Sequence, residues 1–130
     1  MNIYIVVIII IGIKATASIN TMELYNSLYE NTKNIKSPLD DSKKSYLLQT
    51  IPKLDEKGHE TIFFLIRMYH LQQVKDVTFG IPYDSSVQTD QVEFNLDNFP
   101  NQLQHMLYMF VQMHFEYLSY ELMRTKKMDL

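Results

Sequence analysis

The chain has 130 residues, a formal net charge of −3, 46% hydrophobic residues and no cysteine. This length allows a single domain. The lack of cysteine excludes a disulfide scaffold, an iron–sulfur centre, a thiolate zinc site and a cysteine nucleophile. The negative charge predicts no general attraction to nucleic acid or anionic lipid. Few glycines and many apolar residues favour a small helical domain.

The most apolar stretch lies at the N-terminus, where residues 3–13 read IYIVVIIIIGI. It is shorter than the roughly 20 residues of a transmembrane helix, and residues 15–17, Ala-Thr-Ala, resemble a signal-peptide cleavage site. A signal peptide, a short anchor, a buried β-branched strand and a translated leader before a start at Met22 all remain open. We expect residues 1–21 to be an apolar leader and residues 22–130 to form the domain.

Localisation follows from the same alternatives. A start at Met22 predicts an intracellular protein, in the cytoplasm or nucleus of a host cell. A working signal at residues 3–13 predicts a secreted or membrane-associated protein.

Apolar residues recur with helical spacing in four segments, near residues 22–34, 42–48, 53–71 and 99–124. Asp40, Asp41 and Ser42 offer N-cap oxygens for the second segment. The third is the most apolar and is expected to be the most buried, through Ile62, Leu65 and Ile66. In the last segment, the residues expected to face the core are Leu103, Leu107, Phe110, Met113 and Tyr117.

Residues 72–90 show no helical period, although residues 77–79, Val-Thr-Phe, suit a short strand. Residues 91–97, QVEFNLD, alternate strictly between polar and apolar types, as in a half-exposed strand. The expected fold is therefore mainly α: a bundle of about four helices with one short extended segment before the last long helix.

Motifs for phosphate binding, for a serine nucleophile elbow and for zinc proteases are absent from the sequence. No two of the four histidines lie four residues apart; we expect His59 and His105 on exposed helix faces and His114 at the border of the core. We therefore expect no enzyme, no metal site and no cofactor. Direct nucleic-acid binding is not expected either, because the aromatic segment between Phe94 and Met123 contains no lysine or arginine.

Two segments resemble the NET (extraterminal) domain of bromodomain proteins. Residues 51–67, IPKLDEKGHETIFFLIR, are similar to its opening helix: Ile51 and Leu54 match an Ile-x-x-Leu entry. Residues 91–111 are similar to its second half, an acidic alternating strand followed by a helix. The other matching apolar positions are Ile62, Leu65, Ile66, Val92, Phe94, Leu96, Phe99, Leu107, Phe110 and Val111.

The chain also departs from that family. Gln91 and Asn95 replace two acidic positions, and the 72–90 loop is longer. Short proteins of similar layout are encoded by large nucleocytoplasmic DNA viruses, so the resemblance also suggests a viral source.

The resemblance implies a protein-interaction module whose strand edge binds a partner peptide of alternating basic and apolar residues by strand addition. The implied partner-binding residues are Val92, Glu93, Phe94, Asn95, Leu96 and Asp97. The alternative is a membrane-tethered or secreted helical protein of unknown role, addressed by residues 3–13. A membrane is a partner only if that run is an anchor, and the oligomeric state is left open.

Overall fold

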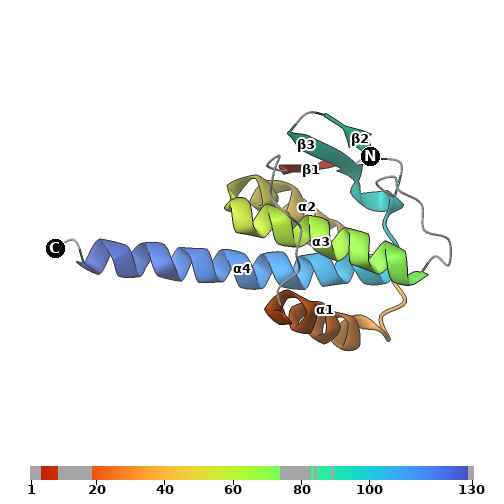
Figure 1. Cartoon of the computed structure of the whole chain (residues 1–130), viewed down its shortest axis with the longest axis horizontal. Coiled ribbons are helices and arrows are strands. Elements are labelled where there is room, and N and C mark those ends of the chain that lie inside the picture. The colour runs from red at the N-terminus through yellow and green to blue at the C-terminus, as the bar shows by residue number, and fades with distance from the viewer. Residues whose placement is uncertain (1–3, 9–18, 74–82, 84, 89, 129–130) are drawn as a thin grey trace.

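The computed structural model describes residues 4–8, 19–73, 83, 85–88 and 90–128. These residues form four α-helices and a small sheet (Figure 1), which confirms the expected mainly α fold. The elements in chain order are β1 (Tyr4–Ile8), α1 (Ile19–Thr32), α2 (Asp41–Thr50), the 3₁₀ turn η1 (Ile51–Lys53), α3 (Glu56–Gln73), β2 (Ser86–Val87), β3 (Gln91–Asn95), the 3₁₀ turn η2 (Leu96–Asn98) and α4 (Asn101–Met128).

Helix α2 begins where the sequence predicts a cap. The Asp40 carboxylate accepts hydrogen bonds of 2.8 Å from the Lys43 amide and 2.8 Å from the Ser42 hydroxyl. The bond from the Lys43 amide, followed by that from Ser42, lowers the pKa of Asp40. The cap satisfies an amide that has no partner within the helix.

Helix α4 is the central element of the bundle. It packs against α1 on one side and against α2 and α3 on the other (Figure 1). The expected core of α3 is confirmed, because Ile62, Leu65 and Ile66 are fully buried. On α4 the buried residues are Leu103, Gln104, Met106, Leu107, Phe110 and Val111.

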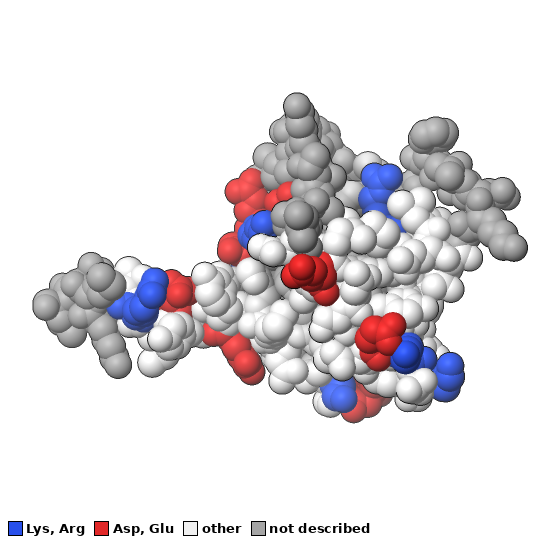
Figure 2. Space-filling view, turned by 60° about the horizontal axis from the view of Figure 1, so that its bottom comes forward, with Lys and Arg blue, Asp and Glu red and all other residues white. Residues whose placement is uncertain are grey.

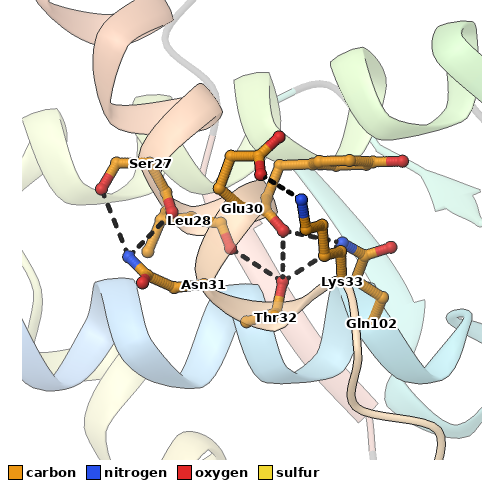
Figure 3. Close-up of polar contacts among 8 residues, drawn as sticks. Ser27, Leu28, Glu30, Asn31, Thr32, Lys33 and Gln102 are labelled. Carbon is orange, nitrogen blue, oxygen red and sulfur yellow. Dashed lines mark hydrogen bonds and ion pairs between the residues drawn. The ribbon is translucent and has the colours of Figure 1, made fainter.

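Gln102 of α4 binds the last turn of α1, as Figure 3 shows. Its side-chain nitrogen donates to the Tyr29 carbonyl at 3.0 Å and to the Thr32 hydroxyl at 3.3 Å. The Thr32 hydroxyl in turn donates to the Leu28 carbonyl at 2.7 Å. The end of α1 is therefore held by side chains rather than by water.

A second amide, Gln104, lies two residues further along α4 and is buried. Its oxygen accepts from the Leu39 amide at 3.1 Å, and its nitrogen donates to the carbonyls of Phe99 at 3.0 Å and Leu96 at 3.3 Å. This side chain links the segment before α2 to η2, and its polar atoms are paired.

The sheet has the strand order β1-β3-β2, with both pairings antiparallel. β1 comes from the apolar N-terminal run, and Ile5 and Val7 are part of the core. The expectation that the domain is confined to residues 22–130 is therefore wrong, and the buried-strand alternative describes residues 4–8. The reason is a pairing between segments more than eighty residues apart in sequence, such as Val7 with Val92.

Two sequence expectations concern residues outside the described part of the chain. These are the strand suggested at residues 77–79 and the apolar residues 9–13 that follow β1. None of the helices in the described part combines the length and the hydropathy needed to cross a bilayer.

Candidate functional site

Residues 91–95 of the segment expected to bind a partner form β3, and their side chains alternate as predicted. Leu96 and Asp97, expected in the strand, lie in η2 instead. Val92, Phe94 and Leu96 are buried in the core. Glu93 and Asn95 are half-buried on the opposite face of the sheet. The apolar members of the proposed binding set therefore pack against the protein's own helices, where they do not reach a peptide.

The expectation of a free edge on this strand is wrong. β1 pairs with all five residues of β3, from Gln91 opposite Ile8 to Asn95 opposite Tyr4. On its other side β2 pairs with Val92 and Glu93. A peptide added along the whole of β3 would have to displace β1 on one side, or β2 from Val92 and Glu93 on the other.

The polar end of the same segment has local partners. The Asn95 side chain accepts from the Asp97 amide at 3.0 Å and caps η2. The Asp97 carboxylate pairs with Lys44 of α2 at 2.8 Å. Asn95 and Asp97 thus connect the strand to the helices, and Glu93 is the acidic group on the outer face of β3.

His59 is buried, which corrects the expectation of an exposed position. Its Nδ1 accepts a 3.2 Å hydrogen bond from the Ile8 amide at the end of β1. Burial lowers the pKa of His59, although Asp55 and the Ile51 backbone oppose the shift. The imidazole is therefore neutral and holds the side of β1 that faces away from β3.

His114 and Asp55 form a second contact in which a histidine joins two parts of the helical body. His114 Nε2 lies 2.8 Å from an Asp55 carboxylate oxygen, and the ring stacks on Phe110. Burial acts to raise the pKa of Asp55, but the hydrogen bonds from His114 and the Gly58 amide outweigh it and the pKa is lowered. The pair ties α4 to the start of α3. Among the described residues, no cluster of three or more His, Cys, Asp or Glu side chains could hold a metal ion.

The most unusual surface lies on α4, which extends well beyond the rest of the protein (Figure 1). We call residues 112–128 the α4 tail. It exposes Met113 by 50%, Tyr117 by 57% and Tyr120 by 64%. Spacings of four and three residues place these side chains on one helix face, in line with the buried Met106 and Phe110. The stripe that packs the body thus continues into solvent.

Charges on the α4 tail are separated along its length. Glu116 and Glu121 lie nearer the body, whereas Arg124 and Lys126 lie near the tip. Figure 2 shows this order, with acidic groups towards the body and basic groups outward. Arg124 also pairs with Glu121 within the helix at 2.9 Å.

The helical spacing of Met113 and Tyr117 predicts that they face the core, but this prediction is wrong, because both side chains are exposed. Helical periodicity identifies the apolar face of α4, but it does not reveal where the neighbouring helices end. The expected helix lengths did contain a signal for this exposure. The last expected helix is longer than each of the other three, so no neighbour is long enough to cover all of it.

Comparison of the chain with family models, with curated proteins and with solved structures finds no match. The resemblance to the NET domain therefore stays a hypothesis, and the function is argued from the surface alone.

Proposed function

We propose that this chain is a non-enzymatic protein-interaction module that binds an amphipathic helix along the α4 tail. The observation that carries this proposal is the exposed stripe of Met113, Tyr117 and Tyr120 on a helix that leaves the body. Exposed apolar patches on small proteins commonly mark interaction sites. Tyrosine is enriched among the residues that dominate binding energy, and methionine adapts to varied partners.

A helix is the partner that fits this surface. A convex helical face with apolar residues spaced by four and three packs best against a second stripe of the same spacing. Beyond the half-buried Phe115 and Leu118, the tail exposes Tyr120, Leu122 and Met123, and a packed partner helix would stabilise this segment. Full burial of each large side chain contributes roughly 1.5–3 kcal/mol. About half of that remains to be gained at these positions, so after the costs of association we expect binding in the roughly micromolar range.

The test is selection of amphipathic helical peptides against the full-length chain, followed by affinity measurement with two variants. Tyr120→Glu places a charge in the stripe. Ser119→Glu places the same charge on the same exposed turn but on a different face. We expect selected peptides to bind wild type and the Ser119 variant alike, and to lose at least about tenfold in affinity for the Tyr120 variant. Equal binding to all three proteins would contradict the proposal.

A second candidate keeps strand addition but moves it to the outer side of β2. Within the described part of the chain, β2 is an edge strand with exposed Ser86 and Val87. The acidic groups Glu93 and Asp90 lie beside it, and they suit a partner with alternating basic and apolar residues. Replacing both acids with lysine should weaken such a peptide by repulsion, and unchanged binding would dismiss this candidate.

A further inference from the structure

We infer that the helix bound by the α4 tail is the same tail of a second copy, in an antiparallel pair with Tyr120 on the two-fold axis. This inference rests on the proposed use of the tail as a binding surface. It names the partner and fixes the register, and three independent features of the tail lead to it.

The length of the tail selects the register. Gln112 is the first exposed residue after the buried Val111, and the helix ends at Met128. His114, Phe115 and Leu118 are still half-buried, but Phe115 and Leu118 lie on the side of the helix away from Met113, Tyr117 and Tyr120. The midpoint of the tail is Tyr120, so pairing about that residue lets each tail run its full length, roughly 25 Å, beside the other. The tip of each tail then reaches the point on the other copy where the buried part of α4 begins. If each tail moved further towards the body of the other copy, its tip would run into that body. If the two tails moved apart along their axes, part of the apolar stripe would be left uncovered.

The apolar residues match one another in this register. Tyr117 and Met123 are each three residues from Tyr120, so Tyr117 of one copy faces Met123 of the other. Tyr120 faces its own counterpart. All three side chains are more than half exposed in the single chain, and an isologous contact of this kind closes into a dimer without leaving a free surface.

The charges select the antiparallel direction. Glu116 and Arg124 are each four residues from Tyr120, so the carboxylate of one copy faces the guanidinium of the other, twice per dimer. The Arg124 guanidinium has several N–H donors, so it can bind this carboxylate while it keeps its pairing with Glu121 of its own helix. A parallel pair in register would place Glu116 beside Glu116 and Arg124 beside Arg124, which is repulsive. The antiparallel arrangement also opposes the two helix dipoles favourably.

The buried area agrees with a dimer of modest stability. Taking roughly 200 Å² for each large side chain, the exposed fractions of Met113, Tyr117, Tyr120 and Met123 give about 450–500 Å² per copy. Two copies then bury close to the roughly 1,000 Å² that a specific interface needs, before the flanking charged residues are included. We therefore expect a dimer that dissociates on dilution.

The direction and register are tested by single-cysteine variants, because the chain contains no cysteine. Under oxidised glutathione, Tyr120→Cys should form a disulfide-linked dimer. Met113→Cys should not, since two copies of residue 113 lie roughly 20 Å apart in the antiparallel pair. A mixture of Tyr117→Cys and Met123→Cys should cross-link with each other. Cross-linking of the Met113 variant as readily as the Tyr120 variant would overturn the antiparallel register.

Self-association is measured by sedimentation equilibrium of the wild-type chain and of charge variants. We expect a monomer–dimer equilibrium that Glu116→Arg and Arg124→Glu each weaken at least about threefold and that the double exchange restores. A wild-type chain that stays monomeric up to about 1 mM, the weak limit of specific binding, would overturn this inference. The proposed function would still stand if selected helical peptides bound in a Tyr120-dependent manner. Flotation of a monomeric chain with phosphatidylcholine–phosphatidylserine vesicles would instead identify a lipid surface as the occupant and overturn both.

Discussion

A pair of substitutions in β1 tests whether the N-terminal strand belongs to the fold. Ile5 and Ile8 lie on the same five-residue strand, but Ile5 is 2% exposed and Ile8 is 48% exposed. Replacing either by alanine removes the same carbon atoms from the same strand. The difference between the two variants therefore reports chiefly the difference in burial.

The magnitudes follow from these exposures. Each carbon lost from a fully buried site costs roughly 0.8 kcal/mol, about 2.4 kcal/mol for isoleucine to alanine, and the cavity adds to this. We expect Ile5→Ala to lower the free energy of unfolding by about 2–4 kcal/mol. Ile8→Ala should cost about 1 kcal/mol, because half of the side chain is already in water and no cavity forms.

The assay is urea-induced unfolding of the full-length chain, followed by circular dichroism and extrapolated to water. Equal, small losses for the two variants would refute the placement of β1. Such a result would return the folded domain to residues 22–130, as the sequence alone suggested.

Three further predictions concern the polar contacts of the body. Gln104→Met should lower the free energy of unfolding by about 1–3 kcal/mol in the same assay, because it leaves the buried Leu39 amide without its acceptor. A loss below about 0.5 kcal/mol would mean that water replaces the Gln104 side chain as the acceptor. Burial lowers the pKa of His59, so its contribution to stability is complete above the unfolded pKa of about 6.5 and declines as the pH falls from there to the lower folded value. The melting temperature should therefore fall between about pH 7.5 and pH 5, and His59→Gln should flatten that decline; an unchanged slope would assign it to other groups. Replacing Lys44 by methionine should cost less than about 1 kcal/mol, because methionine keeps the packing of the largely buried Lys44 stem and loses only the pairing with the partly exposed Asp97. A larger loss would show that the pair is needed to fix η2.

The parts of the fold that the sequence predicts correctly depend on local signals. The Asp40 cap needs only its own turn, and the buried stripe of Ile62, Leu65 and Ile66 needs only the helical period. The alternation of β3 is local as well, so the faces of that strand are confirmed.

The parts that the sequence does not predict depend on contacts between distant segments. An apolar run such as residues 3–13 has the composition of a signal peptide and of a buried strand alike, and the pairing of β1 with β3 decides between them. The burial of His59 follows from the same strand, because the ring lies against the Ile8 amide. The free edge expected for β3 fails for this reason too.

The candidate site differs from the sequence-based one because periodicity does not report packing partners. Met113 and Tyr117 carry the spacing of a core stripe, and only the positions of the other helices leave them in solvent. A continuous apolar stripe on a helix longer than its neighbours is the signal that would have located the α4 tail.

Amide hydrogen exchange along the full-length chain, with and without a selected helical peptide, tests the central claim most directly. At a concentration where the chain is monomeric, the outer part of the free tail, beyond Leu118, should exchange rapidly, because its side chains lack the packing that protects the rest of α4. On binding, we predict that exchange slows at residues 113–123 and is unchanged in β2 and β3. Protection that appears instead along β2, with the tail unaffected, would contradict the account and place the binding surface at the edge of the sheet.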